Sequence, residues 1–193
     1  MELVDIFDDN NNFTGQIVER REAHNKKLNV RTVSCWILNE KGEVLMQKRS
    51  KNKIRNPNRW AKTGGQVSSG ETVEEAIYRE VKEEIGIEIP REEIKIQSVK
   101  KIDSRFTYNF IFFVNYKIED YIIQKEELSE VKYMTIEYLE NAQREHNNNF
   151  TFVNWKEGSF GEEIKTLKEN RLKILEGKVH IIGKEKNKTI INK

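Results

Sequence analysis

Residues 64–87 read GGQVSSGETVEEAIYREVKEEIGI. The segment Glu71–Ile85 is predicted to form a helix, because apolar residues recur in it at helical spacing and Gly86 stands just past its end. Gly64 and Gly65 precede this helix at the end of a strand-like segment. A missing side chain there would let the backbone approach a ligand or a metal, although a Gly–Gly pair alone is more often only a turn.

One face of the predicted helix begins apolar and ends in carboxylates. The arc that should face the core in the first turns continues into Glu80 and Glu84, with Glu83 at its edge, so the three acids lie within reach of one another. Acids on a helix are usually a solvated face, as expected of Glu74 and Glu75 in the first turn. Like charges on a core-facing arc repel at a high cost, and a divalent cation relieves that cost. Ligands that are all oxygen fit Mg²⁺, with Mn²⁺ as a substitute.

The composition excludes several other classes of protein and site. The chain has 193 residues with a net charge of +2, and its 9 Phe, 6 Tyr and 3 Trp are typical of a folded domain. Cys35 is the only cysteine, which excludes an intrachain disulfide and a cysteine-built zinc site, and 3 widely spaced histidines argue against a histidine metal site. No apolar stretch approaches the ~18 residues of a membrane span, and the first residues have no signal-peptide pattern. We expect a cytoplasmic protein without a membrane partner.

The remaining sequence predicts an α/β fold, with a mixed sheet and helices on its faces. We expect a single domain over residues 1–175, with an N-terminal hairpin within 1–29 and a C-terminal helix at 160–175, followed by a polar, basic tail at 176–193. The predicted strands are 3–7, 13–19, 30–38, 43–47, 94–102, 108–118 and 131–136, and a further short helix is predicted at 137–143.

Residues 65–87 resemble the Nudix signature, Gly-x5-Glu-x7-Arg-Glu-U-x-Glu-Glu-x-Gly-U, in which U is a bulky aliphatic residue. The matching residues are Gly65, Glu71, Arg79, Glu80, Val81, Glu83, Glu84, Gly86 and Ile87. The resemblance covers roughly residues 1–142. It implies an α/β/α sandwich around a mixed sheet, and an enzyme that hydrolyses a diphosphate linkage, often in a nucleoside diphosphate joined to another group.

The resemblance also implies a role for each matched residue. The metal ligands would be Glu80, Glu83 and Glu84; the nearby backbone would be that of Gly64 or Gly65; and the residues that brace the loop and the acids would be Glu71 and Arg79. Physical chemistry agrees with this scheme, because Mg²⁺ on diphosphate oxygens shields the charge of the transition state and acidifies a bound water.

A carboxylate must then accept the proton of that water. Glu80 and Glu84 are candidates on the helix, and Glu127 and Glu130 are candidates from the loop and strand start after Tyr121. The simpler interpretation of the last two is a solvated loop. We include Glu130 among the catalytic candidates.

The first half of the chain resembles the Nudix branch that includes isopentenyl-diphosphate isomerase, in residues 3–8, 13–15 and 45–50. Those isomerases carry a cysteine before the helix for proton transfer at carbon, whereas residues 60–65 here have none, and Cys35 lies in a strand pattern typical of the core. Isomerisation is therefore the second candidate. A non-catalytic module that binds a nucleotide or RNA is the third, although such modules usually lose the metal acids.

Two basic segments indicate which kind of molecule the protein binds. Residues 48–62 contain seven Lys or Arg and no acid, and one or two of these side chains could receive substrate phosphates. Residues 165–193 are also basic but lack the interleaved aromatics that stack on single-stranded nucleic acid. We therefore expect a small-molecule diphosphate as substrate and no nucleic acid, with a homodimer as the commonest assembly on general grounds.

Overall fold

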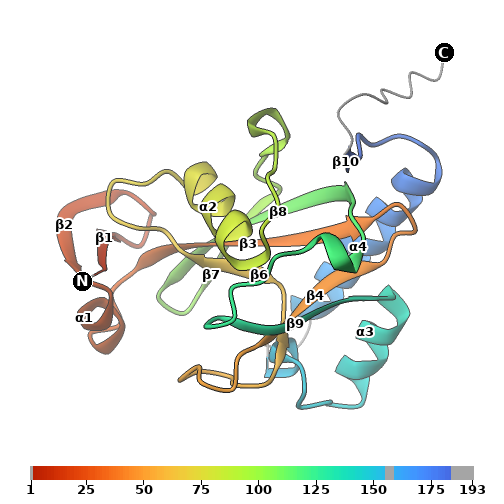
Figure 1. The fold of residues 1–193 in the computed structure, drawn as a ribbon. Helices are drawn as coiled ribbons and strands as arrows, with labels where there is room; N and C mark the ends of the chain where they lie inside the picture. Colours follow the sequence, from red (N-terminus) through yellow and green to blue (C-terminus); the bar gives the residue numbers. More distant parts are fainter. Residues whose placement is uncertain (1, 155–158, 184–193) are drawn as a thin grey trace.

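The computed structural model describes residues 2–154 and 159–183, and its centre is one large mixed sheet (Figure 1). Strand β3 (Val30–Asn39) lies between β8 (Arg105–Asn115), to which it is parallel, and the antiparallel β4 (Val44–Arg49). The other strands of this sheet are β5 (Trp60–Ala61), β6 (Thr63–Gln66), β7 (Ser98–Ile102), β9 (Leu128–Met134) and β10 (Ile182–Gly183).

Helices cover both faces of this sheet. Helix α2 (Val73–Ile85) packs on one face, where its apolar side chains join Val33 and Cys35 of β3 in one core cluster. Helices α3 (Ile136–Arg144) and α4 (Ser159–Leu175) pack on the other face, in a second cluster with Trp36 and Leu38. Successive residues of β3 alternate between the clusters, as strand geometry requires. The predicted α/β/α sandwich is confirmed.

Helix α2 begins and ends where its sequence signals stand. Thr72 forms a capping box with Glu75: the Thr72 hydroxyl accepts the Glu75 N–H at 3.2 Å, and the Glu75 carboxylate accepts the Thr72 N–H at 2.9 Å. Gly86 follows the last turn at a φ of 73°, where a Cβ would lie 2.7 Å from the Cβ of Ile122. Glycine is therefore needed both for the backbone angle and for the approach of the loop that contains Ile122.

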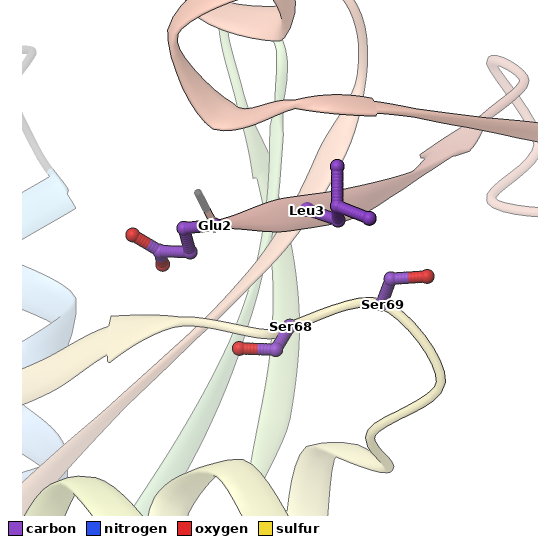
Figure 2. A pocket seen from close by; sticks show the side chains of 4 residues that line it. All are labelled: Glu2, Leu3, Ser68 and Ser69. Atoms are coloured by element: carbon purple, nitrogen blue, oxygen red, sulfur yellow. The ribbon is translucent and has the colours of Figure 1, made fainter.

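The N-terminal strands β1 (Leu3–Phe7) and β2 (Phe13–Glu19) pair as the predicted hairpin and form a separate two-stranded sheet. The six-residue helix α1 (Arg20–Asn25), which was not predicted, follows β2. Strand β1 runs beside the loop that precedes α2 (Figure 2), and the Ser69 N–H donates to the Leu3 carbonyl at 2.9 Å. The hairpin is thus attached to the loop that leads into the predicted active site.

Some boundaries differ from those predicted. The strand predicted from residue 94 begins at Ser98, because a 3-10 turn (Arg91–Glu93) follows Pro90. Two further 3-10 turns occupy Ile118–Asp120 and Thr151–Asn154. Within the tail expected at 176–193, Ile182 is buried and pairs with Val114 of β8; residues 184–193 lie outside the described residues.

Candidate active site

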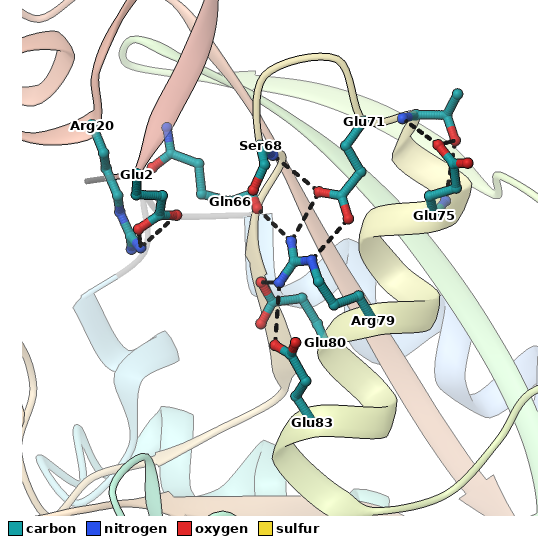
Figure 3. Close-up of polar contacts among 10 residues, drawn as sticks. Glu2, Arg20, Gln66, Ser68, Glu71, Glu75, Arg79, Glu80 and Glu83 are labelled. Carbon is teal, nitrogen blue, oxygen red and sulfur yellow. Dashed lines mark hydrogen bonds and ion pairs between the residues drawn. The ribbon is translucent and has the colours of Figure 1, made fainter.

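The guanidinium of Arg79 is the centre of the polar network on α2 (Figure 3). Its Nε and Nη2 donate to the two carboxylate oxygens of Glu71 at 2.8 and 2.9 Å, in the two-pronged geometry that arginine favours. Nη2 also donates to the Gln66 carbonyl at 3.1 Å, and Glu71 in turn accepts the Ser68 N–H at 3.0 Å. One guanidinium thus ties the loop between β6 and α2 to the helix.

The same side chain holds two of the three predicted metal ligands. Its Nη1 donates to Glu80 at 2.8 Å and approaches Glu83 at 3.4 Å. All three guanidinium nitrogens of Arg79 therefore contact protein oxygens, and the bonds with Glu71, followed by those with Glu80, raise its pKa. The geometry favours bracing of the loop and acids over a direct contact with a phosphate.

Glu84 is the most deeply buried acid of the group, with 6% of its surface exposed. Its carboxylate accepts the side-chain N–H of Gln47 at 2.8 Å, and Gln47 is oriented by the Thr63 hydroxyl at 2.9 Å. The Gly64 N–H also donates to Glu84. Burial raises the pKa of Glu84 to about 8, and the nearby charge of Glu80 acts in the same direction.

The two glycines of β6 make room for different neighbours. A Cβ on Gly65 would lie 2.1 Å from Oε1 of Glu80, so the carboxylate of Glu80 rests directly against the Gly65 backbone. A Cβ on Gly64 would lie 2.3 Å from the carbonyl of Val33 in β3. The missing side chains therefore let Glu80 approach the backbone at Gly65 and let β3 approach it at Gly64.

The carboxylates of α2 are suitable ligands for a divalent cation, although too few of them lie together to surround one. Throughout residues 2–154 and 159–183, no three His, Cys, Asp or Glu side chains are close enough together to hold an ion. Burial raises the pKa of Glu80 as well as that of Glu84, so each carboxylate would ionise more readily beside a cation. The side chain of Glu83 is 56% exposed and free to turn toward them. These oxygens match the preference of Mg²⁺ and Mn²⁺.

The other two candidate bases, Glu127 and Glu130, lie in different positions relative to the acids of α2. The charge of Glu127 raises the pKa of Glu84, so Glu127 lies near the acids of α2. Glu130 pairs with Lys48 in the β4–β9 ladder, one position from Gln47, whose side chain reaches Glu84. Neighbouring positions on a strand face opposite sides, so Glu130 is directed to the other face of the sheet. The structure does not bring Glu130 to the acid group.

Two further members of the site carried no signal that sequence reasoning detected. Gln47 donates to Glu84 and Thr63 donates to Gln47, from strands that are distant from Glu84 in sequence, and each belongs to an ordinary strand pattern. Their role depends on which face of the strand is covered by α2, which requires the strand register.

Most cations in the basic segment 48–62 contact other protein groups. Lys53 pairs with Glu127, and Lys62 Nζ lies 3.6 Å from a carboxylate of α4. Arg55 contacts His24 of α1. These contacts fasten the segment to the loop before β9, to α4 and to the N-terminal helix.

Comparisons with known proteins find relatives in one family. A model of the NUDIX domain matches residues 28–156. An uncharacterized Nudix hydrolase of Clostridium acetobutylicum is 33% identical over 139 residues, which span 66% of each chain. A second, from Listeria monocytogenes, is 32% identical over 72% of this chain and 83% of its own length.

The fold has a solved counterpart in a crystal structure from Deinococcus radiodurans, with a TM-score of 0.67 and 23% identity over 86% of this chain and 99% of the other. Within the described residues, no helix has the length and apolar character needed to cross a membrane. The sequence signature, the sandwich fold and the matched domain together show that the chain belongs to the Nudix hydrolase family.

Proposed function

We propose that the protein hydrolyses a diphosphate linkage in a nucleoside diphosphate joined to another group, or in a related organic diphosphate, with Mg²⁺ as its cofactor and Mn²⁺ as a substitute. One observation carries the proposal: α2 directs Glu80 and Glu84 into a buried position against the Gly64–Gly65 backbone, where Arg79 and Gln47 orient them. Two carboxylates buried this closely are poorly compensated unless a cation is bound.

Glu80 and Glu84 would hold the cation, and Glu83 would join them after leaving Arg79. The bound cation would shield the diphosphate oxygens and lower the pKa of a water. Arg79 fixes Glu80 and, through Glu71, the loop beneath the substrate. Preorganised groups of this kind need no rearrangement when charge develops.

Glu127 is the loop carboxylate that we assign to proton acceptance. Its charge acts on Glu84 from an element other than α2, and it pairs with Lys53. A base outside the ligand set can accept a proton from the attacking water without giving up its place on the cation. Glu130 is not retained in this role, because its strand position faces away.

The isomerase-like alternative would need a group that can protonate carbon. Cys35 is 1% exposed in the core between β3 and α2, and burial raises its pKa well above the usual range. It therefore cannot take the place of the cysteine that residues 60–65 lack. A non-catalytic module would have no need of the Glu80, Glu83 and Glu84 set, so hydrolysis remains the function that this site supports best. We expect it to act in the cytoplasm on a small molecule, as a monomer or homodimer.

The test is release of phosphate or nucleoside monophosphate from a panel of sugar nucleotides, dinucleotides, nucleoside triphosphates and isopentenyl diphosphate, with Mg²⁺ and with chelator. Glu84→Gln should abolish turnover, whereas Glu74→Gln, the same change in the first turn of α2, should leave it unchanged. Silence of the whole panel would count against hydrolysis, and conversion of isopentenyl diphosphate without release of phosphate would favour the isomerase.

A further inference from the structure

The N-terminal unit places a cation opposite the acids of α2. Arg20, the first residue of α1, donates from Nη1 to both carboxylate oxygens of Glu2, at 3.0 and 2.7 Å. The charge of Arg20 is also near enough to lower the pKa of Glu80. Figure 3 shows the Arg20–Glu2 pair apart from the Arg79 network, with Gln66 between them.

The position of Arg20 is fixed by the backbone. The Arg20 N–H donates to the Glu2 carbonyl at 2.9 Å, so the start of α1 is tied to the start of β1. Asp5 of β1 accepts the Ser69 hydroxyl at 2.6 Å and the Gly70 N–H at 3.2 Å. The hairpin is thus attached to the loop that Arg79 braces, and Arg20 is held in place relative to Glu80.

A hollow lies beside Glu2 of this pair, between β1 and the loop before α2. This hollow of about 560 Å³, open to solvent, is lined by Glu2, Leu3, Ser68 and Ser69. In Figure 2 the carboxylate of Glu2 projects from one wall and the two serines form the other. The side chains of Arg20 and Glu2 are 53% and 43% exposed, so their ion pair is accessible and contributes little to stability.

His24, on the same helix face as Arg20, links this region to the basic loop. His24 lies one helical turn after Arg20 and contacts Arg55. Positive charge therefore continues from α1 into the loop beside the acids. Such an arrangement attracts polyanions, which the carboxylates of α2 alone would repel.

We propose that Arg20 receives a phosphate of the bound diphosphate, and that Glu2 is an internal counter-ion that the substrate displaces. This inference rests on the proposed function, because the cation at Glu80 and Glu84 would hold one side of the diphosphate while Arg20 binds the other. A phosphate oxygen accepts from a guanidinium N–H as a carboxylate oxygen does, so a phosphate can replace the two bonds that Nη1 of Arg20 donates to Glu2. The exposed Glu2 pair is easily replaced.

The test measures binding and turnover separately. Methylenediphosphonate, which resists hydrolysis, is titrated with Mg²⁺ into the wild type, Arg20→Gln, Arg20→Lys, Glu2→Gln and the control Arg21→Gln. Arg20→Gln should weaken binding by about tenfold or more, the loss expected of a hydrogen bond to a charged group. Arg20→Lys should recover part of it. Glu2→Gln should tighten binding by up to about fivefold, since it removes a weak surface pair.

The second measurement is the steady-state kinetics of a panel compound that the wild type hydrolyses. Arg20→Gln should raise KM with a change in kcat of less than about threefold, because it removes binding shared by the ground and transition states. If Arg20→Gln weakened diphosphonate binding but the wild type hydrolysed no compound of the panel, Arg20 would remain a phosphate ligand and the proposed hydrolase function would be refuted. If the wild type hydrolysed a compound and Arg20→Gln changed neither KM nor diphosphonate binding, the assignment of Arg20 would be refuted while the hydrolase function stood. Equal losses of binding in Arg21→Gln and Arg20→Gln would have the same meaning.

Discussion

Replacing Gly65 with alanine should disable the site while leaving the fold intact. The new Cβ would lie 2.1 Å from Oε1 and 2.2 Å from Cδ of Glu80. Since contacts between such atoms are rarely closer than about 3 Å, the carboxylate must move by roughly 1 Å, out of its 2.8 Å bond with Arg79. A displacement of that size at a reacting centre can cost about a hundredfold in rate.

The cost to folding should be small, because the atoms that must move are the end of a flexible side chain. Gly64→Ala is the matched comparison: its Cβ would lie 2.3 Å from the Val33 carbonyl and 2.7 Å from Cα of Ser34, both backbone atoms of β3. Overpacking against atoms that cannot rotate away typically costs about 1–3 kcal/mol, and the φ of 157° at Gly64 adds strain.

Thermal unfolding and Mn²⁺ binding measured on both variants distinguish the two effects. At about 2–4 °C per kcal/mol for a chain of this length, Gly64→Ala should lower Tm by several degrees, whereas Gly65→Ala should lower it by about 3 °C or less. Gly65→Ala should nevertheless lose most Mn²⁺ affinity and at least about 99% of kcat/KM. Wild-type metal binding in Gly65→Ala would refute the reasoning, and so would a Tm loss equal to that of Gly64→Ala.

Three further outcomes follow from the same geometry. The pKa of Glu84 is raised from 4.5 to about 8, so the folded, metal-free protein binds an extra proton between these values; its unfolding free energy should fall as pH rises through that window. Denaturant unfolding in chelator should show this fall, and Glu84→Gln or saturating Mg²⁺ should reduce it. Arg79→Lys should lower stability by about 1–3 kcal/mol in the same assay, because a lysine cannot reproduce the paired bonds to Glu71. Glu127→Gln should reduce kcat by about a hundredfold or more with unchanged Mn²⁺ affinity, whereas Glu130→Gln should leave kcat within about twofold; equal effects of the two variants would contradict the assigned base.

Local signals in the sequence predicted most of the architecture. The apolar arc of α2, the glycine after its last turn and the hairpin at residues 3–19 depend on neighbours within a few positions, and the structure has each of them. The burial of Glu84 also follows from this arc, because it shares a helix face with Ala76 and Ile77. Short-range periodicity was sufficient for these features.

The choice between Glu127 and Glu130 could not be made in this way. Both acids stand near the start of β9, and only its register with β4 shows that Glu130 is opposite Lys48 while Gln47 faces Glu84. A shift of one residue would exchange the two faces. The roles of Gln47, Thr63 and Arg20 depend on similar long-range placement, which local patterns do not contain.

The charges around α2 explain why the two halves of the site must work together. Three carboxylates, those of Glu71, Glu80 and Glu83, contact the single guanidinium of Arg79, and Glu71 already engages two of its nitrogens. Glu84 adds a fourth, buried carboxylate nearby. The excess negative charge attracts a divalent cation but repels the phosphates of a free substrate. Arg20 lies near this excess on a separate element and pairs with the displaceable Glu2. When the substrate binds together with its cation, the carboxylates of α2 pair with the cation and Arg20 pairs with a phosphate. The cation alone would leave Arg20 without the phosphate, and the phosphate alone would face the uncompensated carboxylates.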